Sequence, residues 1–171
     1  MNNILETDRA VLREITAGDA EFILDLLNQP SFIRNIGDRK VRSIDEARDY
    51  IESRFMKSYR ENGFAMWAIE LKETGKLIGL CGFVKRDGLP DSDIGFALLP
   101  QFEKQGYAFE TASAAMRYGA DVLKFPRVLA VTSKTNESSG RLLGKLDFKF
   151  ERFVVLPGSA EELKLFFYPA S

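Results

Sequence analysis

The order of apolar and polar residues along the first quarter of the chain predicts a strand followed by a helix. Residues 4–15 alternate between apolar and polar side chains, which is typical of a half-buried strand. Thr16 can cap the helix that follows, and Pro30 ends it. Residues 31–42 have no regular period, so we expect an irregular segment there.

The rest of the chain continues to alternate between helical and strand-like patterns. Ser43 and Glu46 form a capping box for a helix that runs to about residue 62, where Gly63 closes it. Further on, the pattern predicts strands over 64–71, 76–84 and 92–99, a helix over 105–123, a strand over 127–133, a helix over 136–145, and a terminal hairpin of 148–156 with 162–168. A helical connection makes the strand over 127–133 parallel to the strand before it. The prediction is an α/β (α+β) domain with a mixed, mostly antiparallel sheet and helices on both faces.

Length and charge narrow the class of protein. The 171 residues suffice for one domain with a full core, and without a linker or repeat we expect a single domain over 1–171. With 24 basic and 25 acidic residues the net charge is −1, which argues against a nucleic-acid surface. No signal-peptide pattern or membrane-spanning apolar run is present, so we expect a cytoplasmic protein without a membrane partner.

Two residue types limit the chemistry. Cys81 is the single cysteine and the sequence contains no histidine. An internal disulfide, a multi-cysteine zinc site and a histidine-activated nucleophile are therefore excluded, and we expect no metal. Cys81 stands between apolar residues of a predicted strand and is interpreted as a packed thiol.

The junction between the strand over 92–99 and the helix over 105–123 has no capping side chain. It reads LLPQFEKQGYAFE from Leu98 to Glu110, with no Ser, Thr, Asp or Asn to accept from the first helical N–H groups. Such a helix start attracts an anion, because the free amides and the helix dipole are positive. Gly106 lets an anion approach the backbone, and Lys104 adds a cation. The alternative is that these amides face water.

A second short segment follows the strand over 127–133. Asn136 stands directly after the strand, and Ser139 comes three residues later. Capping of a short helix by Asn136 is the simplest interpretation of this spacing. The segment also stands at a position where a second part of a binding site could lie.

Taken together, the motifs resemble those of the GNAT N-acetyltransferase superfamily, in particular its RimJ/RimL-like ribosomal-protein N-acetyltransferase branch. The resemblance covers nearly the whole chain and is carried by the order of five stretches: LETDRAVLR at 5–13, TGKLIG at 74–79, DIGFALLP at 93–100, GYAFETA at 106–112, and NESSGRLLGKLDF at 136–148. It implies the GNAT fold, with a splayed parallel strand pair, and acetyl-CoA as cosubstrate.

The resemblance also implies where acetyl-CoA binds. Its pyrophosphate would lie on the uncapped helix start, formed by Lys104, Gln105, Gly106, Tyr107 and Ala108. Its pantetheine arm would bond to the backbone around Leu98 and Leu99 as an added strand does. Asn136 and Ser139 would contact the end of that arm and the sulfur.

Some positions differ from the family pattern. Leu143 stands where many members carry a tyrosine that protonates the departing thiolate, which leaves Ser139 as the nearest donor. Asp93 stands where relatives often carry a glutamate, and it is the candidate for ordering a water that takes the amine proton; the alternative is a surface acid at a strand start. A basic cluster over residues 34–42 lies where relatives build the acceptor pocket. It would attract an acidic peptide or the 3′-phosphate region, or it forms a solvated loop.

The predicted activity is therefore acetyl transfer from acetyl-CoA to a primary amine by direct attack. An α-amine, with a pKa of about 8, is neutral far more often at pH 7 than a lysine side chain. A protein or peptide N-terminus is accordingly the first candidate acceptor. A small amine, such as a polyamine, an amino acid or an antibiotic, is the second. A non-catalytic acyl-CoA-binding module is the third, and the sequence leaves a monomer and a homodimer open.

Overall fold

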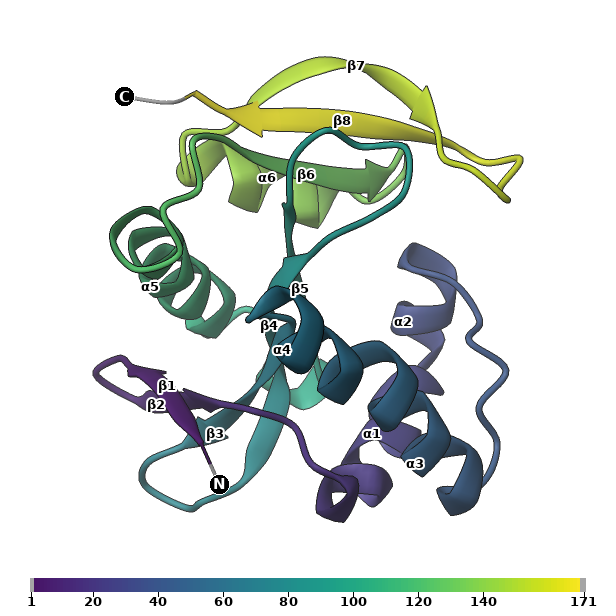
Figure 1. Cartoon of the computed structure of the whole chain (residues 1–171), viewed down its shortest axis with the longest axis vertical. Coiled ribbons are helices and arrows are strands. Elements are labelled where there is room, and N and C mark those ends of the chain that lie inside the picture. The colour runs from purple at the N-terminus through teal and green to yellow at the C-terminus, as the bar shows by residue number, and fades with distance from the viewer. Residues whose placement is uncertain (1, 170–171) are drawn as a thin grey trace.

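A computed structural model describes residues 2–169 as one eight-stranded sheet with helices on both faces (Figure 1). The strands are β1 (Asn3–Glu6), β2 (Ala10–Arg13), β3 (Met66–Leu71), β4 (Leu77–Val84), β5 (Asp93–Leu98), β6 (Val128–Ser133), β7 (Lys149–Val155) and β8 (Glu162–Tyr168). They lie in the order β1-β2-β3-β4-β5-β6-β8-β7. Neighbours are antiparallel except for β5 and β6, which are parallel, as predicted.

The N-terminal segment is a hairpin, so the prediction of one strand over residues 4–15 is wrong. β1 and β2 pair antiparallel around a turn at residues 7–9. Thr7 holds this turn, because its hydroxyl oxygen accepts a hydrogen bond from the Ala10 N–H at 3.0 Å. Three consecutive polar residues, Thr7 to Arg9, interrupt the alternation and mark the turn.

The first helical region also differs from the prediction. Thr16 precedes a short 3₁₀ turn (Ala17–Asp19) that leads into α1 (Ala20–Leu27). Pro30 does not end this helix but starts another, α2 (Pro30–Asn35), within the segment expected to be irregular. Proline fits the first helical position, because its missing N–H would have no intrahelical acceptor there.

The predicted helix after Ser43 is present over its full length. It consists of α3 (Ile44–Ile51), a π-helical turn (Glu52–Met56) and α4 (Lys57–Asn62). The Ser43 hydroxyl oxygen accepts from the Glu46 N–H at 3.1 Å, and Gly63 ends the helix with a φ of 81°. The π-helical turn adds a residue to one helical turn and re-aims the side chains that follow it.

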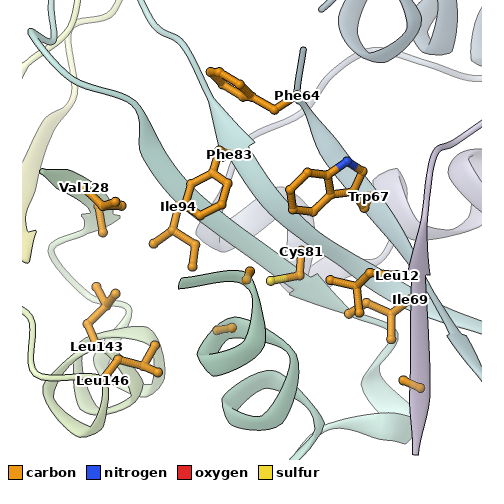
Figure 2. Packing of buried hydrophobic residues seen from close by; sticks show 14 of the residues in the cluster. Leu12, Phe64, Trp67, Ile69, Cys81, Phe83, Ile94, Val128, Leu143 and Leu146 are labelled. Carbon is orange, nitrogen blue, oxygen red and sulfur yellow. The ribbon is translucent and has the colours of Figure 1, made fainter. Parts of the chain in front are cut away.

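Two hydrophobic cores cover the two faces of the sheet. On one face, α5 (Tyr107–Asp121) and α6 (Glu137–Lys145) pack against Trp67, Cys81 and Phe83. Figure 2 shows Cys81 within this cluster, with Trp67 and Phe83 nearby. On the other face, α1 and α3 cover a second cluster that includes Ala68 and Leu80, as the two-residue period of β3 and β4 requires. No helix within residues 2–169 is both long and apolar enough to cross a membrane.

The parallel pair β5–β6 separates soon after it begins. Its single register pair is Asp93 with Leu129, where the Leu129 N–H donates to the Ser92 carbonyl at 3.0 Å. Toward Leu98, β5 keeps its antiparallel partner β4 but has no partner on the side of β6. The splayed pair therefore leaves a row of backbone groups free at the middle of the sheet.

Candidate functional site

A cleft of about 880 Å³ opens where β5 and β6 separate. One wall comes from α2 and the α3–α4 helix, and the other from the start of α5 and from α6. Most of the predicted site residues line it, namely Asp93, Leu98, Lys104, Gly106, Tyr107, Ala108, Asn136 and Ser139. The cleft is large enough for an elongated ligand together with a second, smaller one.

The start of α5 opens into this cleft without a cap. Gly106 is the N-cap residue, and no side chain in the described part of the chain caps the helix there. The first helical hydrogen bond runs from the Glu110 N–H to the Gly106 carbonyl at 3.0 Å, so the amides of Tyr107, Ala108 and Phe109 precede it. Gly106 has a φ of 85°, a conformation that other residues rarely adopt. These features fit an anion that supplies the missing acceptors.

Glu110 is the acid that could have reached back to these amides, but it is engaged elsewhere. It accepts hydrogen bonds from the Thr7 hydroxyl at 2.5 Å and from Arg9 Nε at 2.7 Å. Partial burial raises the pKa of Glu110, but these hydrogen bonds outweigh it and the pKa lies below its usual value. The Arg9 guanidinium in turn lies 4.0 Å from the centre of the Tyr107 ring. The β1–β2 turn thus fixes the first turn of α5 and places a cation beside its start.

Asn136 and Ser139 are joined to each other at the start of α6. The Asn136 Oδ1 accepts from the Ser139 N–H at 3.2 Å, which is the capping interaction. The Asn136 Nδ2 donates to the Ser139 Oγ at 2.9 Å. Because a hydroxyl both accepts and donates, Ser139 keeps its own proton available toward the cleft. Asn136 and Ser139 therefore cap α6 and also line the cleft.

Asp93 is completely buried rather than at the surface, at 0 % exposure. Its two carboxylate oxygens accept from Arg86 Nε at 2.9 and 3.0 Å. Burial raises the pKa of Asp93 to about 6, even though Arg86 acts in the opposite direction. A carboxyl group with this pKa is ionised at neutral pH and close to the pKa that suits a general base.

Two predicted residues lie differently from the rest. Leu99 is buried in the core beneath α1 and α3, and its N–H already donates to the Ile78 carbonyl at 2.8 Å. The Gln105 side chain donates to the Gln101 carbonyl at 2.8 Å. The Leu99 carbonyl also accepts from the Phe102 N–H at 3.0 Å, so both backbone groups of Leu99 are engaged, and neither Leu99 nor Gln105 is part of the cleft lining.

Comparison with known proteins identifies the family. A sequence model described as "Acetyltransferase (GNAT) domain" matches residues 9–149. The chain belongs to the GNAT acetyltransferase family. It is 36% identical over 149 residues to "Uncharacterized N-acetyltransferase YoaA" of Bacillus subtilis (strain 168), covering 86% of this chain and 84% of that protein.

Two solved GNAT structures share the fold at low sequence identity. RimL, described as a ribosomal L7/L12 α-N-protein acetyltransferase in complex with coenzyme A, superposes with a TM-score of 0.84 at 16% identity, over 99% of this chain and 98% of its own. A spermidine N-acetyltransferase SpeG chimera from Vibrio cholerae and hSSAT gives a TM-score of 0.76 at 18% identity, over 94% of this chain and 95% of that one. The expected GNAT fold with its splayed strand pair is confirmed.

The structure adds residues to this GNAT cleft that the sequence did not point out. Thr132 and Ser133 of β6 line it, and their buried hydroxyls have no hydrogen-bond partner among residues 2–169. Two serine or threonine residues at the end of a strand give no signal of their own. Arg86 could have been found from the sequence, because it lies in the turn between the two predicted strands of a hairpin. The β4–β5 register pairs Val84 with Asp93 and so brings this turn close to Asp93.

Cys81 is a packed thiol, as the sequence indicated. It is completely buried in the core, and burial raises the pKa of its thiol to about 12. Trp67 and Phe64 also belong to this core, whereas Tyr50 lines the cleft. Neither a reactive thiolate nor a histidine is thus present in the GNAT cleft of this protein.

Proposed function

We propose that this protein is a single-domain, acetyl-CoA-dependent N-acetyltransferase that acylates the α-amine of a protein or peptide. The observation that carries the proposal is the uncapped start of α5, which opens into the cleft at the splayed strands. Membership of the GNAT family and the shared fold of RimL support it.

The residues of the cleft fit a coenzyme A molecule. The amides of Tyr107, Ala108 and Phe109 would hold the pyrophosphate, with Lys104 beside them. The free edge of β5 near Leu98 would hold the pantetheine amides, which repeat the hydrogen-bonding groups of a peptide. When bound, acetyl-CoA supplies an acetyl group activated as a thioester.

The chain's own residues favour direct attack by the amine over a covalent acetyl-enzyme. Cys81 is out of reach, because it is buried on the α5 side of the sheet with a pKa near 12. A hydroxyl nucleophile would need a base to activate it, and Ser139 has only the Asn136 amide beside it. The amine therefore serves as the nucleophile itself.

Asp93 and Ser139 have complementary roles in this proposal. Asp93 accepts the proton of the amine, directly or through a water, because its carboxylate is ionised above a pH of about 6. Ser139 donates a hydrogen bond from its hydroxyl to the leaving sulfur, because Leu143 stands where many family members carry a tyrosine. A thiol has a pKa of about 8.5, so its thiolate leaves without a strong acid.

The strength of this base favours an α-amine as acceptor. At pH 7 an α-amine with a pKa of about 8 is roughly one-tenth neutral, whereas only about one lysine side chain in a few thousand is. A carboxylate with a pKa near 6 is a weak base and cannot readily deprotonate the more basic amine. A peptide N-terminus matches the site better than a polyamine does.

An acceptor panel tests this proposal. We expect acetyl-CoA-dependent turnover, measured as release of free coenzyme A, with peptides that carry a free α-amine. The same peptides blocked at the N-terminus but carrying a lysine should show less than about one-hundredth of that rate, because of the difference in neutral amine. Turnover of spermidine in preference to every peptide would contradict the proposal. Tight binding of acetyl-CoA without turnover of any amine would also contradict it.

A further inference from the structure

The wall of the cleft that α2 and the α3–α4 helix form is strongly basic. Arg34 of α2, Arg39 of the loop after it, Arg54 of the π-helical turn and Lys57 of α4 all line the cleft. We call these four residues the basic wall. Glu61 is the one acidic residue that the same segment contributes to the lining within the described chain. The wall is basic although the protein as a whole has a net charge of −1.

The side chains of the basic wall have no carboxylate partners, unlike the neighbouring arginines outside the cleft. Within residues 2–169, no carboxylate lies within ion-pair distance of any of its four side chains, and the Arg39 Nε is buried without a hydrogen-bond partner. The arginines of the same segment that lie outside the cleft are all paired: Arg42 with Asp38, Arg48 with Asp45, and Arg60 with Glu52. Among the arginines of residues 31–62, those without a carboxylate partner are thus the ones that line the cleft, whereas Lys40 is an unpaired cation outside the lining.

Cations gathered without counterions repel one another, and this repulsion is relieved when an anion binds among them. A buried guanidinium N–H without an acceptor also needs a partner. The basic wall therefore has the properties of a binding surface for carboxylate or phosphate groups.

The direction of the β5 side chains assigns this wall to the acceptor rather than to the coenzyme. Phe96 and Leu98 pack on the face covered by α5 and α6, whereas Ala97 packs on the face covered by α1 and α3. Asp93 shares the parity of Ala97, so its carboxyl group faces the second side. An amine that reaches Asp93 from that side passes the basic wall.

The opposite wall has cations of its own. Lys104 precedes α5, and Arg141 and Lys145 of α6 also line the cleft. They lie on the same wall of the cleft as the amides proposed to hold the pyrophosphate. The phosphate groups of a coenzyme therefore have cations on the opposite wall to bind to and do not require the basic wall.

We infer that the acceptor amine belongs to a molecule with carboxylate or phosphate groups close to that amine, which the basic wall binds. This inference rests on the proposed function and narrows its substrate class. In a peptide, the anionic groups are acidic residues directly after the N-terminal one; in a small molecule, they lie on the amine's own skeleton. A polyamine is disfavoured, because its remaining ammonium groups meet the same four cations.

Three peptides with the same N-terminal serine test the inference. The residues that follow it are acidic in the first, neutral in the second and basic in the third, and a phosphorylated small amine is the fourth substrate. We expect kcat/KM for the acidic peptide to exceed that for the neutral one by about tenfold, since each exposed ion pair contributes a factor of up to about five. The basic peptide should be the poorest, and added salt should reduce the difference.

A set of variants assigns the preference to the wall. In the triple variant Arg34→Gln, Arg54→Gln, Lys57→Gln, the ratio of acidic to neutral kcat/KM should fall by about tenfold through a higher KM for the acidic peptide. The KM for acetyl-CoA should not change. Arg48→Gln with Arg60→Gln is the matched control, because these arginines lie on the α3–α4 helix, are paired, and are not part of the cleft lining. The control should keep the wild-type ratio.

The outcomes separate the inference from the proposed function. Equal kcat/KM for acidic and neutral peptides would overturn the inference while the proposed function stands. Turnover of the phosphorylated small amine but of no peptide would support the inference and overturn the peptide as substrate. A preference for spermidine or the basic peptide would overturn the inference, and spermidine above all peptides would overturn both.

Discussion

Replacing Gly106 with valine is expected to weaken acetyl-CoA binding by about ten- to hundredfold, since hydrogen bonds to a charged group contribute about 1.5–3 kcal/mol. The valine side chain would stand where an anion approaches the amides of α5. A Cβ at this position meets only the end of the flexible Arg9 side chain, with Nη2 at 3.3 Å, so packing alone does not forbid the substitution. Titration calorimetry with acetyl-CoA measures the effect.

The positive φ of Gly106 requires a control for backbone strain. A residue with a side chain in this conformation costs about 1–2 kcal/mol of stability, whatever the position does. Gly75→Val is the matched variant, because Gly75 has a φ of 71°, has nothing within 4 Å of a new Cβ, and lies in the β3–β4 turn outside the cleft. Both variants should lose similar stability in urea unfolding, and only Gly106→Val should lose affinity. Equal affinities in the two variants would count against the placement of the pyrophosphate.

Asp93→Asn is expected to lower kcat/KM by about 10²–10⁴-fold near pH 7, the usual contribution of a general base. The wild-type rate should rise with pH through about 6 as Asp93 ionises, and again toward pH 8 as the amine loses its proton. The variant should lose the first rise and recover part of its rate at high pH, where more of the amine is neutral. A variant with the wild-type pH profile would exclude Asp93 as the base.

Asp91→Asn serves as the control, because Asp91 also pairs with an arginine, Arg127 at 2.9 Å, but lies outside the cleft lining.

The stability of the protein provides a second readout of Asp93. Folding raises the pKa of Asp93 from 3.8 to about 6, so the folded state favours the protonated carboxyl group. The wild type should therefore lose up to about 3 kcal/mol of unfolding free energy, relative to Asp93→Asn, as pH rises from 4 through 6. A constant difference across this range would mean that Asp93 is not desolvated.

Local signals in the sequence were sufficient for most of the fold. Ser43, Gly63 and the glycine turns mark the ends of elements through backbone geometry that depends on few neighbours, and the observed boundaries lie close to the predicted ones. The two errors share a cause, since polar residues 7–9 and Pro30 each have two structural meanings. A polar triplet can belong to a strand or a turn, and a proline can end one helix or begin the next.

The candidate site could be predicted only in part. The open start of α5 could be predicted because the short stretch from Leu98 to Glu110 contains no residue of a type that caps a helix. The partners Arg9 and Glu110 are 101 residues apart, and the basic wall combines residues from α2, the loop after it, the π-helical turn and α4. Such groupings arise from packing: the sequence pointed out the basic cluster that contains Arg34 and Arg39, but no local pattern showed that Arg54 and Lys57 complete the wall. Burial of Asp93 likewise depends on the elements around it.

A crystal structure of the protein with acetyl-CoA tests the central claim most directly. We predict pyrophosphate oxygens within hydrogen-bonding distance of the amides of Tyr107, Ala108 and Phe109, at the start of α5. A structure in which acetyl-CoA is bound elsewhere, while these amides are capped by a protein carboxylate, would contradict it.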